Sequence, residues 1–209
     1  LNKPQAVVVV HKGPRKNSKI KLEIFDDGTR VDDIINMRKL KPLIPKQKLN
    51  AMIKALAMEI IHDQNYNPVL VIVLKGAGIF GAHLAEQLYP LSPELEFVRL
   101  SSYEGIESTG TVKQVLGISR DLYKRNIIIV EDIVETGLTM VELKDYLINE
   151  KQVNSVKICS LFTRPKNYKT NVVVDYVGME LTDDEFIIGF GLDYDEQGRC
   201  LDEIYKLVE

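Results

Sequence analysis

Two short, uninterrupted apolar runs constrain the fold of this chain more than any other feature. Residues 68–74 are PVLVIVL and residues 126–130 are NIIIV, and neither run contains a charged side chain. A strand that is apolar on both faces is typical of a parallel sheet covered on each side by helices. Residues 45–64, 81–88 and 138–147 space their apolar side chains as one face of a helix does. The alternation predicts right-handed βαβ units and an α/β fold, with a central parallel sheet flanked by helices.

Shorter elements are expected in the rest of the chain. Residues 95–100 and 156–162 are predicted to add strands to the sheet, and residues 20–24 alternate as a half-exposed strand does. Beyond Thr163 the pattern changes to short strands separated by turns, at 172–176, 186–190 and 204–208.

The two chain ends are expected to join in a small lobe, or hood. The prediction is a single domain of residues 1–209, because a chain of this length is typical of one domain. Its core is placed at about 45–163 and its hood at about 1–44 and 164–209.

The charge balance and composition exclude several classes of protein. The 27 Lys and Arg residues are offset by 30 Asp and Glu, so the net charge is −3, whereas nucleic-acid-binding proteins are usually basic. The longest apolar run, residues 69–74, is far shorter than the ~20 residues of a membrane-spanning helix. Cys159 and Cys200 are too few for a disulfide framework. We therefore expect a cytoplasmic protein without nucleic-acid or membrane partners.

The stretch 127–140, IIIVEDIVETGLTM, concentrates the chemistry of the chain. A buried strand is predicted to end in two adjacent carboxylates, Glu131 and Asp132, followed by a loop at 133–137 and then a helix. Ligands of α/β sheets bind beyond the carboxyl ends of the strands. The start of the helix also offers free N–H groups and the positive end of its dipole, so an anion site is expected here.

Side chains in the same stretch suit a phosphorylated sugar. Thr136 and Thr139 add hydroxyl donors, and Gly137 lacks the Cβ that would keep a phosphate away. Glu131 and Asp132 would repel a phosphate, but they suit sugar hydroxyls or a hard cation such as Mg²⁺. A ribose phosphate satisfies both halves of this arrangement.

This stretch also carries a family resemblance. VEDIVETGLT resembles the signature with which type I phosphoribosyltransferases bind phosphoribosyl diphosphate (PRPP), and more narrowly that of the hypoxanthine-guanine phosphoribosyltransferases. Over residues 45–205, three further stretches resemble the family in order and spacing. They are Leu74-Lys75-Gly76, the segment from Arg99 to Tyr103 with Ser108-Thr109-Gly110 and Lys113, and FIIGFGLDY at 186–194 with Arg199.

The resemblance implies purine salvage. The phosphoribosyl group of PRPP would move to N9 of hypoxanthine or guanine, giving IMP or GMP and pyrophosphate. It implies Mg²⁺ as cofactor, PRPP and a purine base as small-molecule partners, and a homodimer or homotetramer. By this resemblance, Glu131 and Asp132 would bind ribose and Mg²⁺, and the 5′-phosphate would be bound by Glu135, Thr136, Gly137, Leu138 and Thr139. Pyrophosphate would be bound by Lys75, Gly76 and Arg199, and the purine by Arg164, Phe186, Ile187 and Asp193. Asp193 would also hold a second Mg²⁺, and Ser102 and Tyr103 would belong to a mobile lid.

Two residues depart from the family pattern. Glu135 stands where the family usually has the Asp that accepts a proton near purine N7, so Glu135 is the candidate catalytic residue, with a reach one methylene longer. Arg164, before Pro165, stands where a Lys donates to the 6-oxo group of the base, and Arg differs in donor geometry and bulk. Lys166 is a possible substitute for that Lys. We expect altered base preference or turnover.

Two alternatives stay open from the sequence. Residues 76–81 spell G-x-G-x-x-G after a strand, which favours a nicotinamide-nucleotide site, but Glu96 lies at the wrong end of the next strand for that role. The departures at Glu135 and Arg164 also keep open a non-catalytic PRPP- or nucleotide-binding paralogue or regulator.

Overall fold

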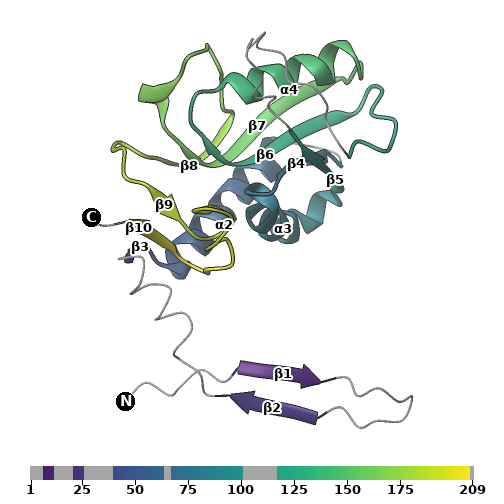
Figure 1. The fold of residues 1–209 in the computed structure, drawn as a ribbon. Coiled ribbons are helices and arrows are strands. Elements are labelled where there is room, and N and C mark those ends of the chain that lie inside the picture. Colours follow the sequence, from purple (N-terminus) through teal and green to yellow (C-terminus); the bar gives the residue numbers. More distant parts are fainter. Residues whose placement is uncertain (1–6, 12–20, 26–39, 64–66, 101–116, 208–209) are drawn as a thin grey trace, which may run out of the picture. The chain divides into compact units, whose positions relative to one another are not determined.

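The computed structural model describes residues 7–11, 21–25, 40–63, 67–100 and 117–207, and it divides the chain into two compact units. One unit comprises residues 1–41 and 207–209, and the other comprises residues 42–206. In the first unit, β1 (Val7–His11) and β2 (Lys21–Phe25) pair antiparallel, with Val7 opposite Phe25 (Figure 1). The boundaries of core and hood within one domain stay a prediction.

The second unit is built on a five-stranded sheet in which all neighbours are parallel, as predicted. The strand order is β5-β4-β6-β7-β8 (Figure 1). The strands are β4 (Val69–Leu74), β5 (Glu94–Arg99), β6 (Asn126–Val134), β7 (Ser155–Thr163) and β8 (Tyr176–Glu180). The fold is therefore α/β, because parallel neighbours require the crossover connections that the intervening helices supply.

Helices cover both faces of this sheet. Helices α2 (Lys46–Asp63) and α3 (Ala77–Gln87) lie on one face and α4 (Leu138–Asn149) on the other (Figure 1). Alternate residues of a strand point to opposite faces, so Leu70 and Ile72 pack with α2 and α3, whereas Val69, Val71 and Val73 pack toward α4. The continuous apolar run of β4 is thus explained by two separate hydrophobic cores.

A second, three-stranded sheet has the order β3-β10-β9. Its strands are β3 (Leu40–Ile44), β9 (Ile187–Ile188) and β10 (Ile204–Leu207), and β10 pairs antiparallel with β9. Short 3-10 helices occupy Tyr89–Leu91 and Pro165–Asn167. Within the described part of the chain, no helix is long and apolar enough to cross a membrane.

Three elements differ from the sequence expectations. Strand β6 continues through Val134, so the two acids lie within it, because β7 pairs with it as far as Thr163. Helix α3 begins at Ala77 rather than at 81. The segment 172–175 is not a strand; β8 begins at Tyr176 and joins the central sheet, and the Asp175 side chain takes the Ile158 N–H that a longer strand would use.

Candidate functional site

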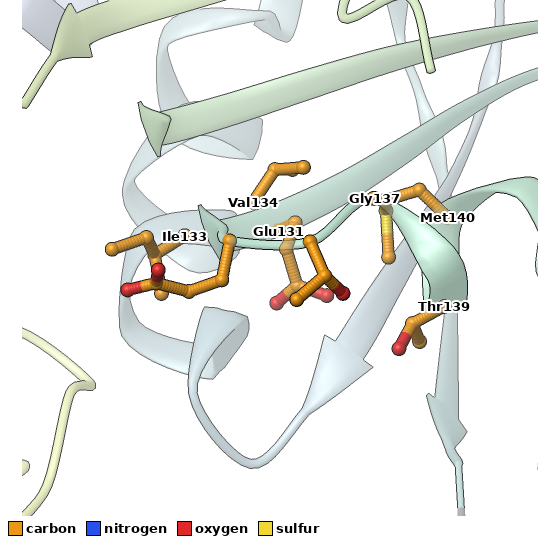
Figure 2. A pocket seen from close by; sticks show the side chains of 8 residues that line it. Glu131, Ile133, Val134, Gly137, Thr139 and Met140 are labelled. Carbon is orange, nitrogen blue, oxygen red and sulfur yellow. The ribbon is translucent and has the colours of Figure 1, made fainter. Parts of the chain in front are cut away.

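The connection from β6 to α4 lines a cavity of about 110 Å³ that is open to solvent (Figure 2). All the lining residues come from this one segment: Glu131, Ile133, Val134, Glu135, Thr136, Gly137, Thr139 and Met140. Figure 2 shows Glu131 and Thr139 projecting to one side of the segment and Val134 to the other. The structure thus brings Glu131, Glu135, the two threonines and Gly137 around one hollow, whereas Asp132 is not part of its lining.

Gly137 determines the shape of the turn before α4. Its φ is +78°, a left-handed conformation that favours glycine, and a Cβ there would lie 2.4 Å from Val172 Cγ1 and 2.7 Å from Thr170 Oγ1. Thr136 Oγ1 accepts a hydrogen bond from the Leu138 amide at 3.4 Å. The helix that follows is 12 residues long, so its first amides and its dipole favour an anion at the cavity.

Main-chain hydrogen bonds hold this turn against the segment that follows β7. The Arg164 amide donates to the Val134 carbonyl at 3.0 Å, and the Lys169 amide donates to the Thr136 carbonyl at 2.9 Å. The backbone of the turn is therefore fixed independently of the side chains that point from it.

Glu131 and Asp132 are both buried, each with about 9% of its surface exposed. Glu131 Oε1 accepts from the Asp132 amide and Asp132 Oδ1 accepts from the Ile133 amide, each at 3.0 Å. Burial and then the neighbouring Asp132 charge raise the pKa of the Glu131 carboxyl well above its usual range. Among the described residues neither acid is paired with a cationic side chain.

A divalent cation fits this pair of acids. Two adjacent buried carboxylates without a counter-ion are costly, and a hard cation bound to their oxygens relieves that cost. The described residues contain no cluster of three or more His, Cys, Asp or Glu that could hold a metal. A Mg²⁺ ion usually takes one or two carboxylates and completes its shell with water and substrate oxygens.

The loop after β4 packs directly on these acids. The Leu74–Lys75 peptide bond is cis. A Cβ on Gly76 would lie 1.9 Å from Asp132 Oδ2, and a Cβ on Gly191, whose φ is +107°, would lie 2.0 Å from the Gly76 carbonyl oxygen. Only glycine allows these three segments to approach so closely.

The residues predicted to bind pyrophosphate meet a second acidic group. Lys75 Nζ lies 2.8 Å from Glu196 Oε2. Arg199 Nη2 lies 2.7 Å from Asp193 Oδ1 and 3.4 Å from Glu196 Oε2, and Arg199 Nη1 donates to the Gly191 carbonyl at 2.8 Å. Lys75, Arg199 and Asp193 are thus brought together, and Glu196, which the sequence did not single out, bridges the two cations.

On the predicted purine side, Phe186 is 46% exposed and meets the Tyr194 ring edge-on, with 5.5 Å between ring centroids. Ile187 is buried in β9. An aromatic face left open in this way can stack on a base.

The two departures from the family pattern contact each other. Arg164 Nη1 lies 2.5 Å from Glu135 Oε1, and Asn167 Nδ2 donates to Glu135 Oε2 at 3.1 Å. Arg164 Nη2 also donates to the Glu185 carbonyl. Both oxygens of the Glu135 carboxylate are therefore held, and nothing in the sequence near Asn167 indicated its part in this.

Lys166 does not replace the family's Lys in the structure. Its ammonium donates to the Thr182 carbonyl at 2.9 Å and lies 3.0 Å from Asp184 Oδ1. The lid residues Ser102 and Tyr103 lie outside the described residues.

Comparison with known proteins places this geometry among phosphoribosyl transferases. The family model for the phosphoribosyl transferase domain matches residues 44–195. The hypoxanthine-guanine phosphoribosyltransferase of Aquifex aeolicus is 37% identical over 176 residues, which cover 83% of this chain and 97% of that protein.

Solved structures agree with the sequence comparison. A hypoxanthine phosphoribosyltransferase from Staphylococcus aureus superposes with a TM-score of 0.74 at 31% identity, covering 84% of this chain and 95% of that one. Another, the glutamic acid mutant in an analysis of an invariant aspartic acid in HPRTs, has a TM-score of 0.73 at 32% identity and covers 80% and 95%.

Proposed function

The chain belongs to the phosphoribosyl transferase family, and we propose from this how its residues carry out the family's reaction. Its function is purine salvage: it transfers the 5-phosphoribosyl group of PRPP to N9 of hypoxanthine or guanine, giving IMP or GMP and pyrophosphate. Nothing in the relatives favours the non-catalytic regulator considered from the sequence. The observation that carries the assignment of roles is the cavity between β6 and α4, which is lined by the buried Glu131 and by the residues at the start of α4.

The 5′-phosphate of PRPP binds at the start of α4. The amides of residues 135–139 and the hydroxyls of Thr136 and Thr139 donate to its oxygens, and the helix dipole favours its charge. Leu138 contributes through its backbone, because its side chain is apolar. The cavity lining and the left-handed turn at Gly137 support this placement.

Glu131 and Asp132 bind the ribose hydroxyls, directly or through Mg²⁺. Asp193 would hold a second Mg²⁺ near Arg199. Bound Mg²⁺ would neutralise negative charge as pyrophosphate leaves. The uncompensated burial of the first two acids and the raised pKa of the Glu131 carboxyl support a cation there.

Pyrophosphate is bound by Lys75, Gly76 and Arg199. The guanidinium of Arg199 can donate two parallel hydrogen bonds to phosphate oxygens. Positive charge develops on the sugar as its bond to pyrophosphate breaks, as in glycoside cleavage, so groups that stabilise the leaving anion accelerate the step. The contact between Gly76 and Asp132 supports a single site for sugar and pyrophosphate.

The purine stacks on Phe186 and is read at its edge by the backbone of Ile187. Glu135 takes the proton that the base releases. The resemblance adds Arg164 to this set, although its side chain is only 9% exposed. A lid containing Ser102 and Tyr103 would exclude water from the activated sugar. Assembly as a homodimer or homotetramer and a cytoplasmic location complete the proposal.

Steady-state assays of the purified protein test this function. With PRPP and Mg²⁺, hypoxanthine or guanine should be converted to its monophosphate with release of one pyrophosphate. Xanthine and adenine serve as comparison bases, and the doubly neutralised Glu131→Gln, Asp132→Asn variant should lose activity and Mg²⁺-dependent PRPP binding together. Measurable PRPP binding without conversion of any oxopurine would contradict the enzymatic assignment.

A further inference from the structure

Glu135, Arg164 and Asn167 form a hydrogen-bonded cluster at the rim of the cavity. The two carboxylate oxygens of Glu135 meet different partners, Arg164 at 2.5 Å and Asn167 at 3.1 Å. Arg164 is 8% exposed overall, whereas the Glu135 side chain is 39% exposed. A molecule that enters from the cavity therefore reaches Glu135 before it reaches the guanidinium.

Both terminal nitrogens of Arg164 are bonded to protein acceptors. One terminal nitrogen is paired with Glu135 and the other donates to the Glu185 carbonyl. Its Nε is buried without a hydrogen-bond partner among the described residues. The guanidinium is thus desolvated and its two terminal nitrogens are already directed at the Glu135 carboxylate and the Glu185 carbonyl.

Asn167 comes from the same short 3-10 helix, Pro165–Asn167, that follows Arg164. The main chain of this segment bonds to the β6–α4 turn through Arg164 and Lys169, not through Asn167. The Asn167 side chain can therefore orient the carboxylate without being needed to hold the turn.

We infer that Arg164 and Asn167 are positioning residues for Glu135, and that Arg164 acts on this carboxylate rather than on the 6-oxo group of the base. This inference rests on the proposed function, in which Glu135 accepts the proton of the purine. The longer Glu side chain has more rotatable bonds than Asp and needs two partners to keep its oxygens in one place. Arg164 supplies one of these contacts and Asn167 the other.

Kinetics of Asn167→Ala and Arg164→Met test the inference. For both we expect kcat to fall by about 10- to 100-fold, as for the loss of one hydrogen bond to a charged group. KM for hypoxanthine should change less than threefold in Asn167→Ala. The preference for hypoxanthine over adenine, a 6-amino base, should stay unchanged in Arg164→Met. Arg164→Lys keeps the charge and should recover most of kcat.

Lys166→Met is the matched control. Lys166 lies in the same 3-10 helix and pairs with Asp184, but it makes no contact with Glu135. Asn167 also hydrogen-bonds Asp184. Because Lys166 contacts Asp184 too, Lys166→Met measures how much disturbing Asp184 alone changes kcat and KM. We expect its kcat and KM to match the unmodified enzyme.

The possible results separate the two assignments. An unmodified protein that converts no oxopurine overturns the proposed function and this inference with it. An active protein in which Arg164→Met accepts adenine, or raises only KM for hypoxanthine, assigns Arg164 to the base and overturns the inference alone. Unchanged kcat in Asn167→Ala, or an equal loss in Lys166→Met, overturns it as well. If Arg164→Met does not fold, the kcat values of Asn167→Ala and Arg164→Lys still test whether these residues position Glu135.

Discussion

Replacing Gly76 by Ala tests how closely the β4 loop packs on the acids of β6. The new Cβ would lie 1.9 Å from Asp132 Oδ2, so the carboxylate has to retreat by about 1 Å to reach an allowed contact. That movement breaks the hydrogen bond from the Ile133 amide to Asp132 Oδ1. The loss of one hydrogen bond to a charged group costs about 1.5–3 kcal/mol. Gly76 has a φ of −58°, which Ala adopts without strain, so the whole loss comes from this contact.

Gly78→Ala is the matched control two residues away. Its Cβ would meet only Leu74 Cδ2, at an ordinary 3.6 Å, inside helix α3. Ala in a helix interior is favoured over Gly by about 0.5–1 kcal/mol. Urea unfolding should therefore show Gly76→Ala less stable than Gly78→Ala by about 2–4 kcal/mol. Only Gly76→Ala should raise KM for PRPP. Equal stability of the two variants would refute the contact between Gly76 and Asp132.

Three further measurements examine other parts of the molecule. Phe186→Ala should raise KM for hypoxanthine by about 5- to 150-fold, because stacking on a base contributes ~1–3 kcal/mol, and leave KM for PRPP unchanged in the same steady-state assay. Burial raises the pKa of the Cys159 thiol, whereas Cys200 is exposed. An aromatic disulfide reagent should therefore titrate one thiol in the folded chain and two in urea, and two fast thiols would contradict the burial. The hydrogen bond from Lys157 lowers the pKa of the Asp63 carboxyl. Its stabilising effect is present above pH 3.8 and is lost as the pH falls through the native value. Asp63→Asn should thus make the acid side of the stability curve shallower in urea unfolding at a series of pH values, and an unchanged curve would show that the pair contributes nothing.

The central sheet could be predicted from the chain because the signal is local. In β4 both the odd and the even positions are apolar, and the structure assigns Val71 to one core and Ile72 to the other. The helical spacing of residues 45–64 likewise matches α2, whose buried residues include Leu49, Ile53 and Ile60. The side-chain period is a property of the backbone itself, so it is visible without any partner.

The G-x-G-x-x-G stretch shows where a local pattern is ambiguous. From the sequence it fits a nucleotide-binding turn as well as a pyrophosphate loop. In the structure Gly76 is required by Asp132 and Gly81 by Ile72, since a Cβ at Gly81 would lie 2.8 Å from two Ile72 carbons. A Cβ at Gly78 would make only an ordinary contact, 3.6 Å from Leu74 Cδ2. The glycines therefore serve packing against β4 and β6.

The residue at which β6 ends could not be predicted from the local sequence either. Charged residues are uncommon in buried strands, so the strand was expected to end at Glu131 and Asp132. Pairing with β7 carries the strand on to Val134 and buries both acids. The raised pKa of the Glu131 carboxyl follows from that burial.

Residue order alone was enough to predict the parallel α/β fold and the family, because both depend on side chains that lie close together along the chain. The phosphate site at 131–139 stays a prediction. The pairing of Glu135 with Arg164, 29 positions apart, the part of Asn167 and the bridge from Glu196 to Lys75 follow only from folding. Such contacts depend on how β6, β7 and the C-terminal turns are placed in space. The spatial distance between residues that are far apart in the sequence is set only when the sheet forms.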